Sequence, residues 1–221
     1  MRKFIFILIT LFSVAAVEAH SLIPSPRCVV YHDGTYTLTT PIVVEYHNEE
    51  LSSIVDYISL YLPTYKATIS SNLKLYIDTS LQSEQYRLDI SPFGLTIAGG
   101  GYGGVFYGLQ TLFQLLPPTI YAGDDFTSVE LPYCTIEDAP QYAHRGFMLD
   151  VCRTWMDKSR VKEFIDLLAY HKINSLRLHL TDDEAWRIEI ESHPELAEIG
   201  GFRGGGSPIW PRYGKWNERW G

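Results

Sequence analysis

The sequence contains little of what marks the more specialised classes of protein. It has 3 cysteines in 221 residues, too few for a disulfide-dense miniprotein. Its 46% hydrophobic and 20% charged residues exclude a disordered or collagen-like chain. Basic residues are scarce: 18 Lys and Arg stand against 26 Asp and Glu, with no basic run, so no nucleic-acid partner is expected. Because no Asn-x-Ser/Thr acceptor is present, we expect no N-linked glycan.

Only the first residues form a long apolar run. Arg2 and Lys3 precede an almost wholly apolar stretch at 4–17, and Val17-Glu18-Ala19 places small residues at a cleavage site. A stretch of this length is too short to span a bilayer core of roughly 30 Å, and a buried N-terminal helix is the alternative. We predict a signal peptide over residues 1–19, no membrane span in the rest of the chain, and a product that enters the secretory pathway and is secreted or lysosomal.

The three cysteines, Cys28, Cys134 and Cys152, all follow the predicted cleavage site. An oxidising compartment would allow two of them to pair and would leave one over. Their wide separation matches no zinc-ligand spacing, and Cys152 is expected to be a small buried apolar residue. The cysteines therefore predict no resident metal.

Residues 20–140 show the pattern of a small α+β domain. The turn Ser91-Pro92-Phe93-Gly94 separates two short β-rich runs, which predicts an antiparallel hairpin. Pro117-Pro118 ends a strongly apolar helical stretch. The predicted strands are 41–46, 73–77, 86–90 and 95–98, and the predicted helices are 49–62 and 105–116.

Residues 141–221 change to a strand–helix–strand pattern. Strands are predicted at 144–151 and 173–180, and Asp157 is the expected N-cap of the helix between them. Val161, Phe164, Ile165 and Leu168 form the apolar stripe of that helix. Three elements within about 40 residues predict a right-handed βαβ unit with parallel strands. Beyond them, 186–190 alternates like a strand, 194–199 could make one or two helical turns, and 200–221 has no periodicity.

Three alternative sites fit this organisation less well. The run from Gly99 to Gly104 satisfies G-x-G-x-x-G, but the strand before it belongs to a hairpin, so close packing explains the glycines without a nucleotide cofactor. His179, Asp182 and Asp183 are possible metal ligands, although alternation would send neighbours to opposite faces, which favours a structural role. A serine hydrolase is excluded because no G-x-S-x-G occurs.

Arg153 and Asp182 form the most informative pair of residues. Each follows an apolar strand, so each is expected at the carboxyl end of a parallel strand, where (β/α) barrels build their active sites. A solvated surface position is the ordinary alternative for either residue alone. Together they favour a site for a polar ligand, because Arg donates two parallel hydrogen bonds and Asp accepts.

Several ordered motifs resemble the family 20 glycoside hydrolases, the β-N-acetylhexosaminidases. In the barrel segment they are HRGFMLDVCR at 144–153, KIN at 172–174, LHLTDD at 178–183, WRIEI at 186–190 and PEL at 194–196. GVFYGLQTL at 104–112 and QLLP at 114–117 resemble the family's non-catalytic N-terminal α+β domain, and IEDAP at 136–140 resembles its join to the barrel. The resemblance covers nearly all of residues 23–200.

The resemblance implies a (β/α)8 barrel of which residues 141–221 form only the first strand–helix units. It implies retaining hydrolysis of terminal β-linked N-acetylglucosamine or N-acetylgalactosamine, in which the sugar's own 2-acetamido oxygen attacks. By position, Arg153 would bind the sugar's 3- and 4-hydroxyls. Asp182 would not contact the sugar but would help to hold and tune the general acid. Asp183, Asn174 and Arg145 would be structural supports. No cofactor is implied, and the full-length form could be a homodimer.

The catalytic Asp-Glu pair of the family follows the fourth barrel strand, so Asp183-Glu184, after the second strand, is not that pair. The sequence also departs from the family at two positions. Thr154 stands where the family usually has His, and Arg177 stands where it usually has an aromatic residue or His. Trp210, Trp216 and Trp220 could stack on a sugar, but a Gly-rich setting argues against an ordered platform. We therefore expect the chain to be inactive alone. A non-catalytic carbohydrate- or protein-interaction module of the same ancestry is the alternative.

Overall fold

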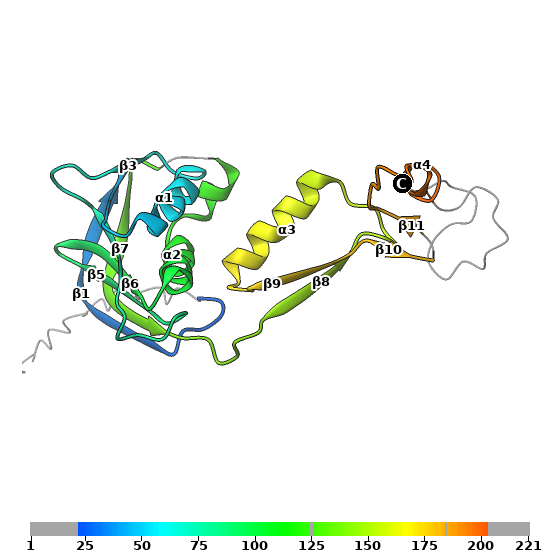
Figure 1. The fold of residues 1–221 in the computed structure, drawn as a ribbon. Helices are drawn as coiled ribbons and strands as arrows, with labels where there is room; N and C mark the ends of the chain where they lie inside the picture. The colour runs from blue at the N-terminus through cyan, green and yellow to red at the C-terminus, as the bar shows by residue number, and fades with distance from the viewer. Residues whose placement is uncertain (1–21, 124–125, 184, 203–221) are drawn as a thin grey trace, which may run out of the picture.

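The computed structural model describes residues 22–123, 126–183 and 185–202. The predicted signal peptide, Glu184 and the three tryptophans of the tail lie outside the described residues. The chain forms a rounded N-terminal body and a strand–helix–strand unit that extends away from it (Figure 1). No helix among the described residues is long and apolar enough to cross a membrane.

A mixed sheet forms one layer of the N-terminal body. The strands are β1 (Cys28–Thr39), β2 (Ile42–Tyr46), β3 (Thr64–Lys66), β4 (Leu73–Ile77), β5 (Tyr86–Ser91), β6 (Gly94–Gly99) and β7 (Ser128–Asp138). Their order in the sheet is β1-β7-β5-β6-β4-β2-β3. The pairs β1–β7, β7–β5 and β5–β6 are antiparallel, and the pairs β6–β4, β4–β2 and β2–β3 are parallel. The predicted β5–β6 hairpin is confirmed.

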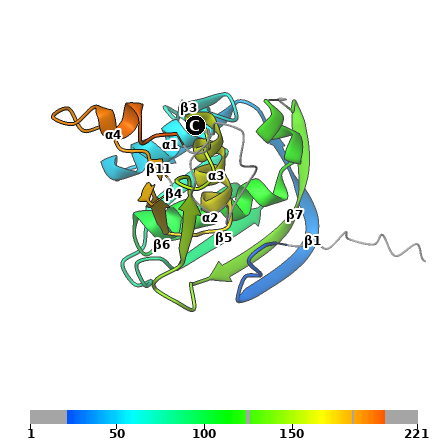
Figure 2. The ribbon, with the colours of Figure 1, turned by 90° about the vertical axis from the view of Figure 1, so that its right-hand side faces the viewer.

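The second layer consists of helices on one face of this sheet (Figure 2). The predicted helix at 49–62 is shorter, a 3₁₀ turn η1 (Glu49–Leu51) followed by α1 (Ser52–Ser59). The predicted helix at 105–116 begins earlier, as α2 (Tyr102–Leu115), because Gly103 and Gly104 form its first turn rather than a loop. A second 3₁₀ turn, η2 (Pro118–Ala122), follows it.

The glycines around α2 allow it to lie unusually close to its neighbours. A Cβ on Gly99 would come within 2.2 Å of the Val105 backbone nitrogen, and one on Gly104 within 2.3 Å of the Gln85 carbonyl oxygen. Any side chain there would force the helix off the sheet. Close packing therefore accounts for the G-x-G-x-x-G pattern.

The barrel segment consists of β8 (Gly146–Asp150), α3 (Lys158–Tyr170) and β9 (Ser175–His179). The strands β8 and β9 are parallel and run in register from Gly146 opposite Ser175 to Asp150 opposite His179. The predicted βαβ unit is thus confirmed. So is the predicted N-cap, because Asp157 Oδ1 accepts a hydrogen bond from the Arg160 backbone N–H at 2.9 Å.

The apolar stripe of α3 is only partly covered. Phe164 stacks on Phe147 of β8 with ring centroids 6.0 Å apart. Ile165, predicted to share this stripe, is 47% exposed. The prediction fails there because, within the described residues, α3 packs on a sheet of two strands and otherwise touches the N-terminal body through a few contacts with α2 and η2.

Beyond β9 the chain makes two short strands and a single helical turn. The elements are β10 (Thr181–Asp182), antiparallel to β11 (Ala185–Trp186), and α4 (Glu195–Glu198). The strand predicted at 186–190 is therefore almost absent, because its alternating side chains find no further partner strand among the described residues. The three cysteines are free, with Cys28 exposed and Cys134 and Cys152 buried, so the pairing considered from the sequence does not occur in the structure.

Candidate active site

The carboxyl ends of β8 and β9 bring together the two residues singled out in the sequence. Asp150 is the last residue of β8, and His179, the last residue of β9, lies opposite it. Arg153 lies in the turn after β8, and Asp182 lies three residues beyond the end of β9. Because parallel strands end at the same edge of a sheet, all four side chains meet there.

The Arg153 guanidinium bridges two carboxylates. Its Nη1 donates to Asp150 Oδ2 at 2.6 Å, and its Nη2 donates to Asp182 Oδ2. The same Asp182 oxygen contacts His179 Nε2 at 2.8 Å. Asp150 also accepts from the backbone N–H groups of Cys152 and Arg153, both at 3.0 Å. The side chain of Arg153 is thereby held in one orientation.

Both carboxylates are ionised at neutral pH. Burial by itself would raise the pKa of Asp150, but hydrogen bonds from the Arg153 backbone and guanidinium outweigh it and lower the pKa. The pKa of Asp182 is lowered most by hydrogen bonding with the Asp183 side chain and next by hydrogen bonding with the Asp183 backbone N–H. His179 and Arg153 lower it further. The hydrogen bond between Arg153 and Asp150 raises the pKa of the Arg153 guanidinium. The cluster is therefore a fixed cation between two fixed anions.

Arg187 fixes the turn that carries Arg153, a role that sequence reasoning missed. Its Nε donates to the Val151 carbonyl at 3.1 Å, and its Nη2 donates to the Cys152 carbonyl at 3.0 Å. Its guanidinium also lies 5.1 Å from the centre of the Trp155 ring. An Arg in an alternating run such as 186–190 usually faces solvent, so the sequence carried no signal for this role.

The remaining residues of the sequence-based site are placed elsewhere or play supporting parts. Arg145 and Asn174 lie at the opposite ends of β8 and β9. Thr154 and Arg177, the two departures from the family pattern, are both exposed. Among the described residues, no three His, Cys, Asp or Glu side chains gather in a way that could hold a metal ion. Asp182 instead contacts a guanidinium and an imidazole.

These observations define a class of protein: an α+β domain joined to the first βα units of a barrel with a polar site at the strand ends. Comparison with family models is more specific. The model of glycosyl hydrolase family 20, domain 2, matches residues 19–139, and the model of that family's catalytic domain matches residues 142–215. The chain belongs to glycoside hydrolase family 20.

Individual relatives agree with this assignment. A β-hexosaminidase of Porphyromonas gingivalis is 33% identical over 196 residues, which are 83% of this chain and 25% of that protein. A β-hexosaminidase of Vibrio furnissii is 31% identical over 206 residues, 91% of this chain and 33% of that protein. The chain therefore spans a quarter to a third of the length of these relatives.

Solved structures show the same fold. The family 20 exo-β-N-acetylglucosaminidase of Vibrio harveyi in complex with N-acetylglucosamine has a TM-score of 0.77 at 32% identity, over 90% of this chain and 32% of that one. The N-acetyl-β-hexosaminidase of Streptomyces plicatus has a TM-score of 0.74 at 36% identity, over 85% of this chain and 40% of that one. The predicted fold class, an α+β domain followed by the start of a (β/α)8 barrel, is confirmed.

Proposed function

We propose that the chain is part of a β-N-acetylhexosaminidase and that it supplies one wall of the sugar site. The substrate is a glycan or glycoconjugate with a terminal β-linked N-acetylglucosamine or N-acetylgalactosamine. The observation that carries the proposal is the Arg153 guanidinium, held between Asp150 and Asp182 at the carboxyl ends of the first two barrel strands. The relative from Vibrio harveyi was solved with N-acetylglucosamine, which supports the choice of sugar.

Arg153 is suited to bind sugar hydroxyls. A guanidinium has five N–H donors, and the contacts to Asp150 and Asp182 engage two of them. The side chain is 33% exposed, so part of it can reach a ligand. Because the two carboxylates orient the group before a sugar arrives, binding would cost little side-chain entropy. We assign the 3- and 4-hydroxyls of the terminal sugar to its remaining donors.

The proposed reaction divides the work between substrate and protein. The 2-acetamido oxygen of the sugar attacks the anomeric carbon, and an acidic residue protonates the leaving oxygen, so the configuration is retained. In the family the protonating Glu and the Asp before it follow the fourth barrel strand, and the present sequence reaches only the second. Asp182 would support that Glu electrostatically. The 221-residue chain alone is therefore proposed to bind the sugar without hydrolysing it.

A non-catalytic interaction module is the second candidate. One observation favours it: apolar side chains of the barrel segment are exposed, including Met148 of β8 at 52% and Leu167 of α3 at 51%. Exposed apolar side chains on a two-stranded sheet and its helix are a surface that another polypeptide could cover. A homodimer of the full-length form is one way to do so.

Titration of the 221-residue chain with N-acetylglucosamine, followed by NMR, tests the first candidate. We expect saturable shifts of the Arg153 and Asp182 signals and at least about tenfold weaker binding in Arg153→Ala, the loss expected for one charged hydrogen-bonding group. Arg160→Ala is the matched control, because Arg160 is an exposed arginine paired with Glu163 on α3. Equal binding by Arg153→Ala and the parent chain would overturn the assignment of Arg153.

A parallel assay with a chromogenic N-acetyl-β-glucosaminide tests the division of labour. We expect no turnover by the chain alone, and turnover that Arg153→Ala abolishes would contradict this.

We also propose a secretory location, either extracellular or lysosomal, on the strength of the predicted signal at residues 1–19. When residues 1–19 are fused to a reporter protein, we expect the reporter to be exported. A reporter that stays inside the cell would overturn the proposed location.

A further inference from the structure

The amino ends of β8 and β9 carry a second polar cluster, opposite to the Arg153–Asp182 pair. Arg145 and Asn174 directly precede the two strands and are hydrogen-bonded to each other. The Arg145 backbone N–H donates to Asn174 Oδ1 at 3.0 Å, and the Asn174 backbone N–H donates to the Arg145 carbonyl at 3.0 Å. The Ser175 N–H donates to the same carbonyl at 3.2 Å. These bonds align the starts of the two strands.

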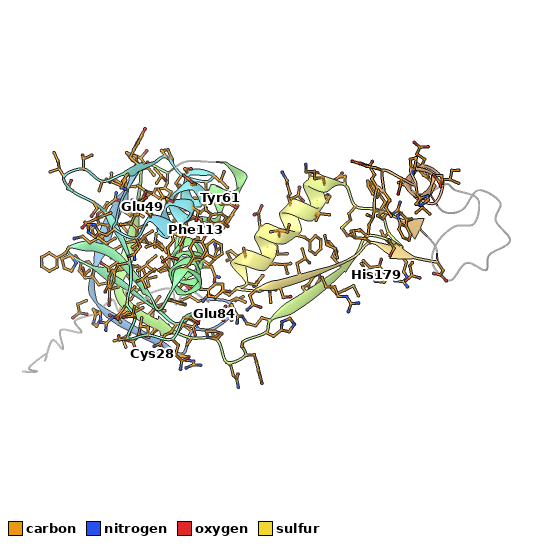
Figure 3. All side chains as sticks on the ribbon, in the orientation of Figure 1. Cys28, Glu49, Tyr61, Glu84, Phe113 and His179 are labelled. Atoms are coloured by element: carbon orange, nitrogen blue, oxygen red, sulfur yellow. The ribbon has the colours of Figure 1, made fainter. Side chains whose placement is uncertain are left out.

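Glu84, in the N-terminal domain just before β5, contacts the starts of both strands. Arg145 Nη1 donates to Glu84 Oε2 at 3.0 Å, and Arg145 Nη2 donates to Oε1 at 3.2 Å. Asn174 Nδ2 donates to Glu84 Oε1 at 3.3 Å. The Tyr107 hydroxyl donates to that oxygen at 3.1 Å from α2. Figure 3 shows Glu84 where the strands leave the N-terminal body and His179 at their far end.

Lys172 provides a second connection between the two parts. Lys172 lies just after α3 and its C-cap residue His171, with a positive φ of 59°, and its Nζ contacts the Tyr86 hydroxyl at 2.8 Å and Asp138 Oδ2 at 3.2 Å. Its carbonyl accepts a hydrogen bond from Arg145 Nε at 2.8 Å. The end of α3 and the start of β9 are therefore tied to β5 and β7 of the N-terminal domain.

The contacts between β8 and β9 do not by themselves hold the two strands firmly in one register. Among the described residues the two strands pair only with each other, and Phe147, Met148 and Leu178 on them are each at least 40% exposed. Leu149 of β8 is buried, but a strand pair with so little covered surface specifies its register weakly, and a slip of one residue turns every side chain to the other face. Such a slip would separate Asp182 and His179 from Asp150 and Arg153.

We propose that Glu84 is a positioning residue for the Arg153–Asp182 pair, because it fixes the register of β8 against β9 by binding Arg145 and Asn174 together. Glu84 acts from the opposite end of the strands and touches neither residue of the pair. Its effect on the strand ends is independent of any ligand. Only its consequence for sugar binding rests on the function proposed above.

Hydrogen exchange at the far strand ends gives a readout that ordinary loss of stability would not reproduce. The N–H groups of Val151 and Cys152 both donate to the His179 carbonyl at 3.2 Å and report the register there. In Glu84→Gln of the 221-residue chain we expect these two amides to exchange about tenfold faster, while amides of β5 and β6 are unchanged. Cross-strand nuclear Overhauser contacts between Asp150 and His179 should weaken in parallel.

Asp89→Asn is the matched control. Asp89 accepts bonds from Arg87 and Thr135 within the N-terminal domain, and its side chain is 33% exposed, compared with 27% for Glu84. Arg145→Lys serves as a second variant because it keeps the charge and loses the two-pronged contact. It should reproduce the faster exchange, which keeps the proposal testable if a Glu84 variant folds poorly.

The outcomes separate this inference from the proposed function. Faster exchange at Val151 and Cys152 in Glu84→Gln, together with a parent chain that binds no N-acetylglucosamine, would support the register role and overturn the function. Sugar binding by the parent chain that is equally strong in Glu84→Gln, with unchanged exchange at these amides, would overturn the register role. Uniformly faster exchange in both domains would also overturn it, because it would show a general loss of stability.

Discussion

The helices α2 and α3 are nearly equal in length, with 14 and 13 residues, but their surroundings differ sharply. Ten residues of α2 are buried, because the helix lies between the sheet and neighbouring helices, α3 among them (Figure 1). None of the thirteen described residues of α3 is buried. Both helices carry apolar residues at helical spacing. An apolar stripe is thus sufficient to form a helix, whereas burial of that stripe depends on what the rest of the chain places against it.

The comparison extends to the two parts of the molecule. Residues 22–139 enclose a continuous core in which side chains such as Val44, Leu88 and Ile136 are fully buried. Residues 140–202 bury only a few side chains, mainly around Cys152 beneath the Arg153 turn. The N-terminal domain is therefore expected to hold most of the free energy of unfolding, and the barrel segment to rely on the contacts that connect it to that domain.

Truncation of one leucine in each helix should show the largest difference. Leu109→Ala in α2 removes a fully buried side chain and should lower the free energy of unfolding by about 3 kcal/mol. Leu167→Ala in α3, where the side chain is 51% exposed, should cost less than about 0.5 kcal/mol. Denaturant unfolding measures both, and comparable losses would mean that α3 is buried in solution, by self-association for example.

Loss of the lysine that connects the two parts should have the next largest effect. Lys172 is buried beside Asp138 and Tyr86, so Lys172→Ala leaves a carboxylate without its cation and should cost about 2 kcal/mol, the loss of a hydrogen bond between charged groups. Lys158→Ala, at an exposed position of α3, is the control. A shift in the thermal midpoint no larger than that of the control would show that the Lys172 contact does not stabilise the junction.

Acid should weaken the junction before it weakens the core. Its hydrogen bonds with Arg145 lower the pKa of Glu84, so this carboxylate stabilises the folded state above its ordinary pKa, near 4.5. The contribution is lost as pH falls through the lowered folded-state pKa. The difference between the parent chain and Glu84→Gln in the free energy of opening of the barrel segment, about 1 kcal/mol at pH 7, should therefore shrink as pH falls below 4.5. A difference independent of pH would contradict this.

Cysteine labelling probes the same contrast without mutation. With a thiol reagent at pH 8 only exposed Cys28 should react rapidly, because Cys134 and Cys152 are buried and burial raises the pKa of both thiols, that of Cys134 to about 11. Cys152 lies in the less stable barrel segment, so mild denaturant should expose it before Cys134. Mass spectrometry identifies the labelled residues. Simultaneous exposure of both would mean that the two parts unfold as one.

Local patterns in the sequence were enough to predict the hairpin, the βαβ unit and the Asp157 cap, since each depends on residues close together in the chain. They also brought Arg153 and Asp182 to one place, because parallel strands share an edge. The long strands β1 and β7 were not predicted. β1 mixes polar and apolar residues and shifts register near Gly34, where φ is 109°, and β7 contains Pro132.

The contacts that connect the two parts could not be predicted for a different reason. Glu84 lies 61 residues from Arg145, and Lys172 lies 34 residues from Asp138. Each of these residues alone looks like an ordinary charged surface residue, and only the folded chain shows that they meet. The same holds for Arg187, whose carbonyl partners Val151 and Cys152 carry no side-chain signal.

Hydrogen exchange across the whole 221-residue chain tests most directly whether stability is divided between a complete domain and the start of a barrel. The account predicts strong protection of amides in α2, β5, β6 and β7 and much weaker protection in α3, with β8 and β9 intermediate because their ends are tied to the N-terminal domain. Equal protection of α2 and α3 would contradict it.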